Sequence, residues 1–422
     1  MTAVAAILTI GDELMLGDRM DTNGPWLSRA LSLLGIDTLQ RCSVKDDVQM
    51  IARIITQLAT TCEILIITGG LGPTEDDRTR EALARAMQEE LVTDHEALAS
   101  IEAWFAARKV HMPKANSVQA QLPKSASWIP NEHGTAPGMK ATIGKCRILC
   151  LPGPPSELKP MFQQAIHEVI SGLPCGAPRC TVEVHSWGMP ESVAGEKIAS
   201  IMRAPDPSVG ILMGIHGITA RVSSNDAEIV ESVASEIEKR WSPWAYGRDT
   251  QTLSQRVGVL LQLQGGTLVT AESCTGGLIG ELIVEPAGAS EWFQGGWITY
   301  SNALKVEQLH VPQAMLDEYG AVSGQVAAAM CKGAISKSGA TAALSTTGIA
   351  GPTGGSEDKP VGTVYIGCVV GDTVEIRLFQ FSGDRTSIQR RTAYTALQML
   401  RLHLRTESFS SMCWQKGGVI YC

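Results

Sequence analysis

Residues 63–77 have the sequence EILIITGGLGPTEDD. The run from Ile64 to Ile67 is fully apolar, which is typical of a strand that is buried on both faces of a sheet. The glycines and the proline that follow it predict a turn, and the apolar spacing beyond predicts a helix over residues 77–87. A buried strand that leads through a glycine turn into a helix is the repeating unit of a parallel α/β sheet.

The same unit recurs along the chain. Apolar strands are expected over residues 4–10 and 147–151, and each precedes an amphipathic helix. The last third repeats the pattern, with a strand over residues 267–271 and a long helix over residues 385–404. We therefore predict two doubly wound α/β domains, whose ligands bind at the carboxyl ends of the strands. Between them, residues 180–241 alternate strand, helix, two strands and helix, which predicts a small α+β unit.

These elements predict three domains, at residues 1–171, 178–245 and 250–405. The boundaries are placed at two segments rich in proline, glycine or tryptophan, which we expect to be linkers: residues 172–178 and 241–249. The tail, residues 406–422, has no hydrophobic periodicity, and we expect it to be frayed.

The composition is that of a globular protein. Of the 422 residues, 44% are hydrophobic and 18% are charged, which excludes disorder as the main state. The formal net charge of −8 argues against direct nucleic-acid binding as the main role. We expect no membrane span and no signal peptide, because the chain has neither a long apolar run nor a basic N-terminal region. Its eleven cysteines include no CxxC pair, which favours reduced thiols and a cytoplasmic location.

A first candidate site lies in the N-terminal domain. Glycine loops such as Gly69–Gly70–Leu71–Gly72 let backbone N–H groups approach an anion, and the N-terminus of the next helix adds positive potential. Acidic residues follow several of the predicted strands, and their loops should converge on one edge of the sheet. Either these acids cap helices, or they bind a divalent cation that bridges to phosphate oxygens. The candidate metal ligands are Glu13, Asp21, Asp76 and Asp77; the candidate substrate-binding residues are Gly69, Gly70, Gly72, Thr74 and Asn131.

A second candidate site lies where the strand at residues 267–271 ends. Ser273 follows in the sequence TAESCTGG, residues 270–277. A serine in this turn is either a helix N-cap or a nucleophile that Lys305 or Tyr300 deprotonates. Cys274 is either a competing nucleophile or a buried, inert thiol. Backbone N–H groups of the turn are candidates to stabilise an oxyanion or bind substrate: Thr275, Gly276 and Gly277.

Two further segments of the last domain suit an anionic substrate. Residues 345–362, STTGIAGPTGGSEDKPVG, contain five glycines after a predicted strand, and such loops cradle phosphates. We single out Thr347, Gly348 and Gly351 in this loop. Arg385 stands at a helix start, where a cation does not stabilise the helix. That position favours a role in binding an anion.

The motifs together resemble those of the CinA family (competence/damage-inducible protein A) over about residues 3–405. They are GDELMLGDRMDTN, TGGLGPTEDD, NEHGTAPG, LPGPPSE, TAESCTGG, WITYSNALK, STTGIAGPTGGSEDKPVGTVY and FSGDR. The resemblance implies an N-terminal molybdopterin-binding fold, a small KH-like middle domain and a C-terminal amidohydrolase domain. Family members of this layout hydrolyse nicotinamide mononucleotide (NMN) to nicotinate mononucleotide and ammonia, and some also cleave ADP-ribose with a divalent cation.

The resemblance also implies roles for single residues. The family's catalytic serine, tyrosine and lysine correspond to Ser273, Tyr300 and Lys305, its substrate-loop threonine to Thr347, and its phosphate-side arginine to Arg385. Deamidation would need no cofactor, whereas the N-terminal domain would use Mg²⁺, Mn²⁺ or Co²⁺. A homodimer that acts on NMN and ADP-ribose is expected. The alternatives are a molybdopterin-related role and a non-catalytic accessory role in competence or DNA damage.

Overall fold

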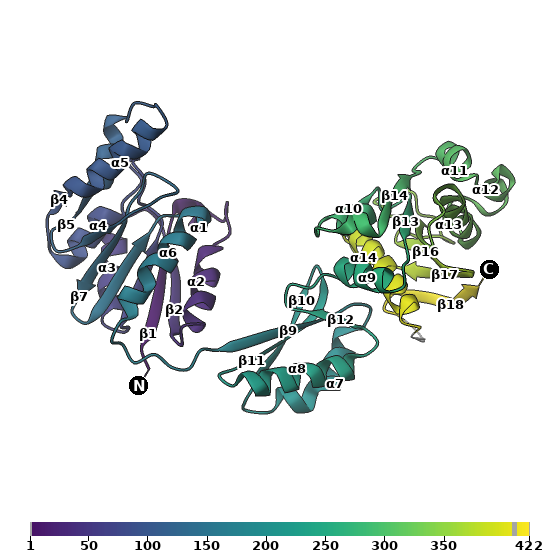
Figure 1. Cartoon of the computed structure of the whole chain (residues 1–422), viewed down its shortest axis with the longest axis horizontal. Coiled ribbons are helices and arrows are strands. Elements are labelled where there is room, and N and C mark those ends of the chain that lie inside the picture. The colour runs from purple at the N-terminus through teal and green to yellow at the C-terminus, as the bar shows by residue number, and fades with distance from the viewer. Residues whose placement is uncertain (1, 407–411, 422) are drawn as a thin grey trace. The chain divides into compact units, whose positions relative to one another are not determined.

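The computed structural model describes residues 2–406 and 412–421. The chain forms two compact units, Met1–Cys180 and Thr181–Cys422. Figure 1 shows the elements of both units along the chain. Among the described residues, no helix combines the length and the apolar character that crossing a membrane requires.

The first unit is built on a six-stranded sheet with the order β2-β1-β3-β8-β7-β6. The first four strands in this order are mutually parallel, and the last two add an antiparallel edge. Their bounds are β1 (Val4–Ile10), β2 (Asp37–Val44), β3 (Ile64–Thr68), β6 (Ser127–Ile129), β7 (Gly138–Ile143) and β8 (Cys146–Leu151).

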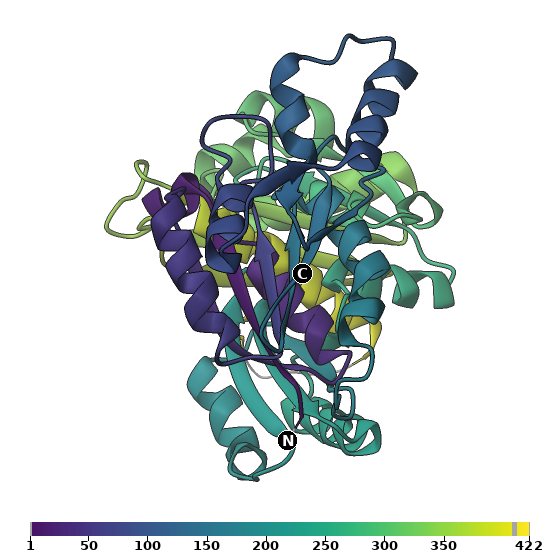
Figure 2. The ribbon, with the colours of Figure 1, turned by 90° about the vertical axis from the view of Figure 1, so that its left-hand side faces the viewer.

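Helices cover both faces of this sheet, as predicted. Residues of β1 alternate between two cores: Leu8 packs with Ile51 of α3, and Ile7 packs with Leu27 of α2. The helices are α1 (Asp12–Leu16), α2 (Asn23–Ser32), α3 (Val48–Ala59), α4 (Thr79–Met87) and α6 (Pro155–Ile170). A projection at one end of the unit is visible in Figures 1 and 2 and consists of β4 (Leu91–Thr93), α5 (His95–Ala107), the 3-10 helix η1 (Lys114–Ala120) and β5 (Gln121–Pro123).

The second unit begins with a four-stranded sheet of order β10-β11-β9-β12. Its elements are β9 (Cys180–Ser186), α7 (Glu191–Met202), β10 (Ser208–Gly214), β11 (Gly217–Ser224), α8 (Ala227–Trp241) and β12 (Ala245–Arg248). Strand β12 occupies part of the segment that we expected to be a linker, residues 241–249. That expectation is wrong for β12, because its backbone pairs antiparallel with β9.

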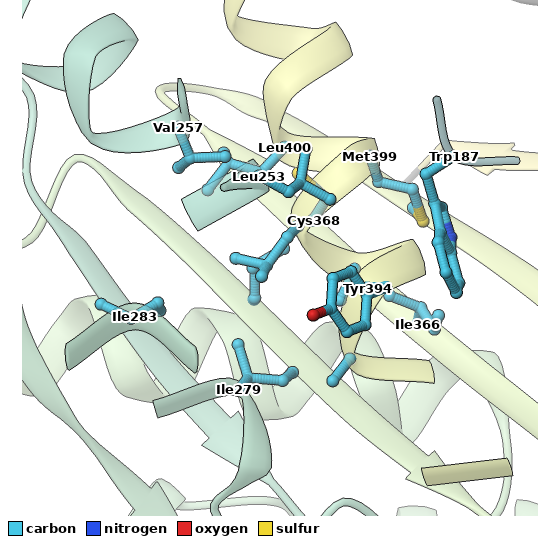
Figure 3. Packing of buried hydrophobic residues seen from close by; sticks show 14 of the residues in the cluster. Trp187, Leu253, Val257, Ile279, Ile283, Ile366, Cys368, Tyr394, Met399 and Leu400 are labelled. Carbon is cyan, nitrogen blue, oxygen red and sulfur yellow. The ribbon is translucent and has the colours of Figure 1, made fainter. Parts of the chain in front are cut away.

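The four-stranded sheet does not stand apart from the C-terminal α/β fold. Trp187 and Tyr246 belong to the same buried cluster as Leu397 and Leu400 of the last long helix. The Trp187 ring stacks on Tyr394 with centroids 4.8 Å apart, and its Nε1 donates to Thr395 Oγ1 at 3.1 Å. Figure 3 shows Trp187 beside Tyr394 and Met399. The middle and C-terminal segments therefore share a core.

The C-terminal sheet is mixed, with the order β14-β13-β15-β16-β17-β18. Strands β14, β13 and β15 are parallel, and the others are antiparallel to their neighbours. Their bounds are β13 (Leu268–Glu272), β14 (Phe293–Ile298), β15 (Ala342–Gly348), β16 (Thr363–Val370), β17 (Thr373–Gln380) and β18 (Gln415–Tyr421).

Helices pack on both faces of the C-terminal sheet too. Helices α9, α10 and α14 supply one core, and α13 supplies most of the other. The helices are α9 (Leu253–Leu263), α10 (Leu278–Val284), the 3-10 helix η2 (Ala289–Glu291), α11 (Asn302–Leu309), α12 (Gln313–Tyr319), α13 (Gly324–Ser338) and α14 (Arg385–Leu404). The predicted α/β class with a doubly wound arrangement is confirmed in both α/β folds.

The C-terminal tail is more ordered than its sequence suggested. We expected residues 406–422 to be frayed, but β18 pairs with β17 and extends the sheet. Met412 is buried, and the Trp414 ring lies 5.6 Å from that of Phe381. These apolar contacts and the free edge of β17 explain the order. Residues 407–411 and 422 lie outside the described residues.

Candidate active site

Ser273 lies directly after β13, at the carboxyl end of the parallel part of the C-terminal sheet. Its backbone N–H donates to the carbonyl of Thr346 on the neighbouring strand β15 at 3.0 Å. The side chain of Lys305, from α11, reaches the same point, and its Nζ lies 3.0 Å from Ser273 Oγ. The structure thus brings together two residues predicted to be catalytic.

The environment of Lys305 favours a neutral amine. The residue is only 1% exposed. Its Nζ donates to the carbonyls of Thr299 at 2.8 Å and Tyr300 at 3.4 Å, and no carboxylate within the described ranges forms an ion pair with it. Burial lowers the pKa of Lys305, because a charged ammonium loses its hydration in such a place. A lysine with a lowered pKa can act as a general base.

The hydroxyl of Tyr300 contacts Arg385, whereas a role as the base for Ser273 would require it to contact Ser273. The Tyr300 side chain is 61% exposed, and its hydroxyl accepts a hydrogen bond from Arg385 Nη2 at 3.3 Å. Only its backbone carbonyl contacts Lys305. Of the two candidate bases for Ser273, the geometry therefore favours Lys305.

A cavity of about 180 Å³ opens at this pair. The predicted site residues that line it are Ser273, Tyr300, Lys305, Thr347, Gly348 and Arg385. The rest of its wall consists of Cys274, Asn302, Ala321, Val322 and Ala350. The Thr347 hydroxyl donates to the Ala321 carbonyl at 2.6 Å, which joins two walls of the cavity. Gly351 does not line the cavity, but its carbonyl accepts a hydrogen bond from Arg385 Nη1 at 2.8 Å and so helps to hold the arginine in place.

The turn after Ser273 uses several of its amides internally. Gly276 N–H donates to the Ser273 carbonyl at 3.2 Å, and Gly277 N–H donates to Glu272 Oε2 at 3.0 Å. Thr275 Oγ1 lies 2.7 Å from Thr346 Oγ1. These predicted substrate-binding groups therefore shape the turn, and none of the three residues lines the cavity.

Glu272 is a residue that the sequence analysis did not single out. Its carboxylate is 1% exposed and also accepts from the amides of Ile279 and Gly280, at 3.1 and 2.9 Å. The carboxylate thus satisfies three N–H groups at the start of α10, where helices leave such groups unpaired. Its place immediately before Ser273 was the only signal available in the sequence.

Cys274 is a poor nucleophile in this structure. The thiol is buried, and burial raises the pKa of Cys274 to about 12. A thiol with so high a pKa stays protonated at neutral pH, and the thiolate is the reactive form. Of the two interpretations of Cys274, the structure favours the inert thiol.

The N-terminal unit has a larger cavity, of about 620 Å³, at the carboxyl ends of its parallel strands. The predicted residues that line it are Gly69, Gly70, Gly72, Glu13, Asp21, Asp76 and Asp77. Thr74 and Asn131 do not line it. The Thr74 hydroxyl donates to Asp77 Oδ2 at 2.5 Å, and Asn131 Nδ2 donates to Glu157 Oε2 at 2.7 Å.

The acids of this cavity do not form a ready cation site. In the part of the chain that the structure describes, no group of three or more His, Cys, Asp or Glu side chains is placed to hold a metal ion. Asp21 Oδ1 accepts from the Gly24 amide at 2.9 Å, and Asp77 Oδ2 from the Thr74 amide at 2.9 Å, as in local caps. The residues present therefore do not fit a preformed divalent-cation site.

Asp46 is a further cavity residue that the sequence analysis missed. Burial raises its pKa, and the carboxylates of Asp12, Glu13 and Asp76 raise it further. Its backbone N–H donates to Asp12 Oδ1 at 3.1 Å, and Asp46 Oδ2 accepts from the Asp12 amide at 2.8 Å. The repulsion among these carboxylates marks this wall of the cavity as strongly acidic.

Comparisons with known proteins agree with this two-part organisation. Residues 6–172 match the family model of the probable molybdopterin binding domain, and residues 250–404 match that of the CinA C-terminal domain. Among solved structures, the competence/damage inducible protein CihA from Agrobacterium tumefaciens is 40% identical and aligns with a TM-score of 0.35. That alignment covers 36% of this chain and 93% of that one.

Full-length relatives cover nearly the whole chain. A putative competence-damage inducible protein of Caldicellulosiruptor bescii is 40% identical over 411 residues, which are 94% of this chain and 98% of the relative. One of the same description from Symbiobacterium thermophilum is 37% identical over 421 residues, which are 95% of this chain and 99% of the relative. With both family models matched in this order and such relatives aligned end to end, the chain belongs to the CinA family.

Proposed function

We propose that the chain is a nicotinamide-nucleotide amidohydrolase that converts NMN to nicotinate mononucleotide and ammonia. The observation that carries this proposal is the pair Ser273–Lys305, with Nζ 3.0 Å from Oγ and the lysine buried. A hydroxyl beside a neutral amine is an activated nucleophile. A serine that serves only as a helix cap has no need of a buried lysine.

The hydrogen bonds of Lys305 suit a base. A neutral amine has two hydrogens and one lone pair. In the neutral form of Lys305, the carbonyls of Thr299 and Tyr300 would accept the two hydrogens. The lone pair would then be left for the hydroxyl hydrogen of Ser273, whose Oγ lies 3.0 Å from Nζ. The same two carbonyls also stabilise the ammonium that forms when the proton is transferred.

The reaction then has two stages. Ser273 Oγ bonds to the carboxamide carbon while its proton passes to Lys305 Nζ. The carbon–nitrogen bond then breaks, and Lys305 returns the proton to the departing ammonia. In the second stage water loses a proton to Lys305 and attacks the acyl ester, and Ser273 regains its hydrogen as nicotinate mononucleotide leaves.

The rim of the cavity suits the anionic part of such a substrate. Arg385 lies there with Tyr300, and a guanidinium presents several donors that match a phosphate. In the present structure two of these donors are bonded to Gly351 and Tyr300, so a phosphate would compete for them. Neutral nicotinamide lacks the phosphate and would bind less tightly.

The direct test measures ammonia and nicotinate mononucleotide released from NMN by the purified full chain. Nicotinamide and nicotinamide riboside serve as matched substrates that lack the phosphate. Ammonia from NMN, and much less from the other two, supports the proposal. No ammonia from any of them, with Ser273 shown to be intact by mass spectrometry, would contradict it.

Two alternatives remain separable by simple measurements. A molybdopterin-related role predicts a bound pterin, which the absorption spectrum of the purified protein would reveal. A non-catalytic accessory role predicts no turnover and no effect of changing Ser273 or Lys305. The expected homodimer and cytoplasmic location stay predictions.

A second activity is proposed for the N-terminal cavity, namely cation-dependent hydrolysis of ADP-ribose. The loop Gly69–Gly72 and the carboxylates of Glu13, Asp21 and Asp77 line the same cavity, which supports binding of a diphosphate there. Because these side chains do not fit a preformed cation site, we derive no step of this reaction.

A further inference from the structure

Helix α14 presents a second side chain to the site besides Arg385. Gln389 lies four residues after Arg385, so the two side chains project from the same face of the helix. Gln389 Nε2 donates to the carbonyl of Cys274 at 2.8 Å, across 115 positions of sequence. The helix therefore holds the residue that directly follows Ser273.

Two successive carbonyls beside the nucleophile are held in place. The Ser273 carbonyl accepts from Gly276 N–H at 3.2 Å, and the Cys274 carbonyl accepts from Gln389. In a planar trans peptide, each carbonyl points opposite to the N–H of the next residue. The N–H groups of Cys274 and Thr275 therefore point away from Gly276 and Gln389.

Of these two N–H groups, that of Cys274 is available for a ligand in the cavity. Over residues 2–406 and 412–421, neither the Cys274 amide nor the Thr275 amide donates to another residue. Both belong to the turn that carries Ser273, but of the two residues only Cys274 lines the cavity. Fixed N–H donors beside a nucleophile stabilise the negative oxygen that forms during attack on a carbonyl group.

We propose that Gln389 is a positioning residue that holds Cys274 through its carbonyl, so that the N–H of Cys274, beside Ser273, serves as an oxyanion donor. This inference rests on the proposed amidohydrolase function and assigns a residue to it. Three hydrogen bonds orient the peptides around Ser273. Two of them join backbone atoms, from Ser273 N–H to the Thr346 carbonyl and from Gly276 N–H to the Ser273 carbonyl. Gln389 supplies the third from a side chain, so a substitution can remove it alone.

The remainder of the turn is held independently of Gln389. Glu272 binds the amides of Gly277, Ile279 and Gly280 from the strand side. Loss of the Gln389 bond should therefore free the 274–275 peptide without unfolding the start of α10. That separation makes the proposal testable.

The decisive variant is Gln389→Leu, which keeps a side chain of similar size and removes the donor. We expect kcat for NMN to fall about tenfold with little change in KM, because an oxyanion donor acts mainly in the transition state. Gln389→Lys should recover much of the loss, since its ammonium can donate to the Cys274 carbonyl. Gln313→Leu, the same change at an exposed position of α12, is the control and should leave kcat unaltered.

A second measurement does not depend on NMN. A fluorophosphonate forms a bond from its phosphorus to Ser273 Oγ, fluoride departs, and the hydroxyl proton passes to Lys305. Its phosphoryl oxygen needs the same donors, so Gln389→Leu should be labelled more slowly than wild type and Gln313→Leu should not. Slow labelling of Gln389→Leu in a protein without NMN turnover would support the positioning role and refute the proposed substrate. Labelling and kcat both within about twofold of wild type in Gln389→Leu would overturn the inference.

Discussion

Lys305 Nζ lies 3.0 Å from Ser273 Oγ, although 32 positions separate the two residues in the chain. Ser273 directly follows strand β13. Lys305 lies on helix α11, which follows β14, the next strand along the chain. The contact depends on the parallel pairing of β13 with β14, which places both strand ends at one edge of the sheet. The catalysis that we propose depends on this contact.

Replacement of Ser273 by alanine should abolish NMN hydrolysis. The carboxamide then has no covalent route, and kcat should fall by about 10³-fold or more. Ammonia release is the measurement, with the melting temperature as a check on folding. Cys274→Ala is the matched control and should keep most of the activity, because the buried thiol is not ionised. Loss of activity in Cys274→Ala, with activity retained in Ser273→Ala, would show that Cys274 and not Ser273 is the nucleophile.

Lys305→Met should remove the pH dependence that the base confers. In wild type, kcat/KM should rise with pH as Lys305 loses its proton, and burial places this rise below the usual pKa of a lysine. The methionine variant should be nearly inactive and should show no such rise. An unchanged pH–rate profile in Lys305→Met would exclude the lysine as the base.

The same lowered pKa affects stability. Between the pKa of the buried Lys305 and that of the unfolded chain, the unfolded state binds the additional proton, so the free energy of unfolding should increase with pH there. Lys305→Met should weaken this increase. Denaturant unfolding between neutral pH and about pH 10 would measure it, since an unfolded lysine titrates near that value.

The middle segment should stabilise the amidohydrolase part without taking part in its chemistry. The residues that line the smaller cavity all fall between Ser273 and Arg385. A fragment of residues 251–405 should therefore hydrolyse NMN, but it lacks Trp187, Tyr246 and β18, which complete its core and sheet. A fragment of residues 181–422 should have the higher melting temperature. In that fragment Trp187→Ala should cost about 3–5 kcal/mol, the usual range for a buried tryptophan.

The sequence predicted those elements whose pattern is strong and local. Strand β1 and helix α14 occur at the expected residues, and residues 180–241 show the expected order of strand, helix, two strands and helix, because the apolar spacing is regular in these segments. Strand β2 was missed because it lies at an edge and most of its residues are partly exposed, which leaves no clear alternation. Strands β12 and β18 were missed since backbone pairing with distant strands, rather than composition, determines them.

The site shows the same limit. Ser273 and Lys305 were predictable because their residue types carry the chemistry and their motifs flank strands. Glu272 and Gln389 were not, since their importance comes from contacts with backbone amides and carbonyls that only the folded chain brings near. The capping use of Asp21 and Asp77 was one of two open interpretations, and local hydrogen bonds decide their present geometry.

The last prediction concerns the N-terminal cavity and Asp77. If a divalent cation and a diphosphate bind there, Asp77 would face the ion with Oδ1, since both Thr74 donors contact Oδ2. Asp77→Asn should then abolish ADP-ribose hydrolysis, whereas Ser273→Ala should not affect it. If Asp77 serves only as a cap, the same variant should lower the melting temperature by a few degrees, which corresponds to about 1 kcal/mol, and alter no activity. Calorimetric titration of the metal-free protein with Mg²⁺ and with ADP-ribose, each alone and then together, separates the two cases. Heat only when both ligands are present would show that the diphosphate brings the cation into a cavity whose own side chains do not form a site for it. No heat under any of these conditions would refute the second activity.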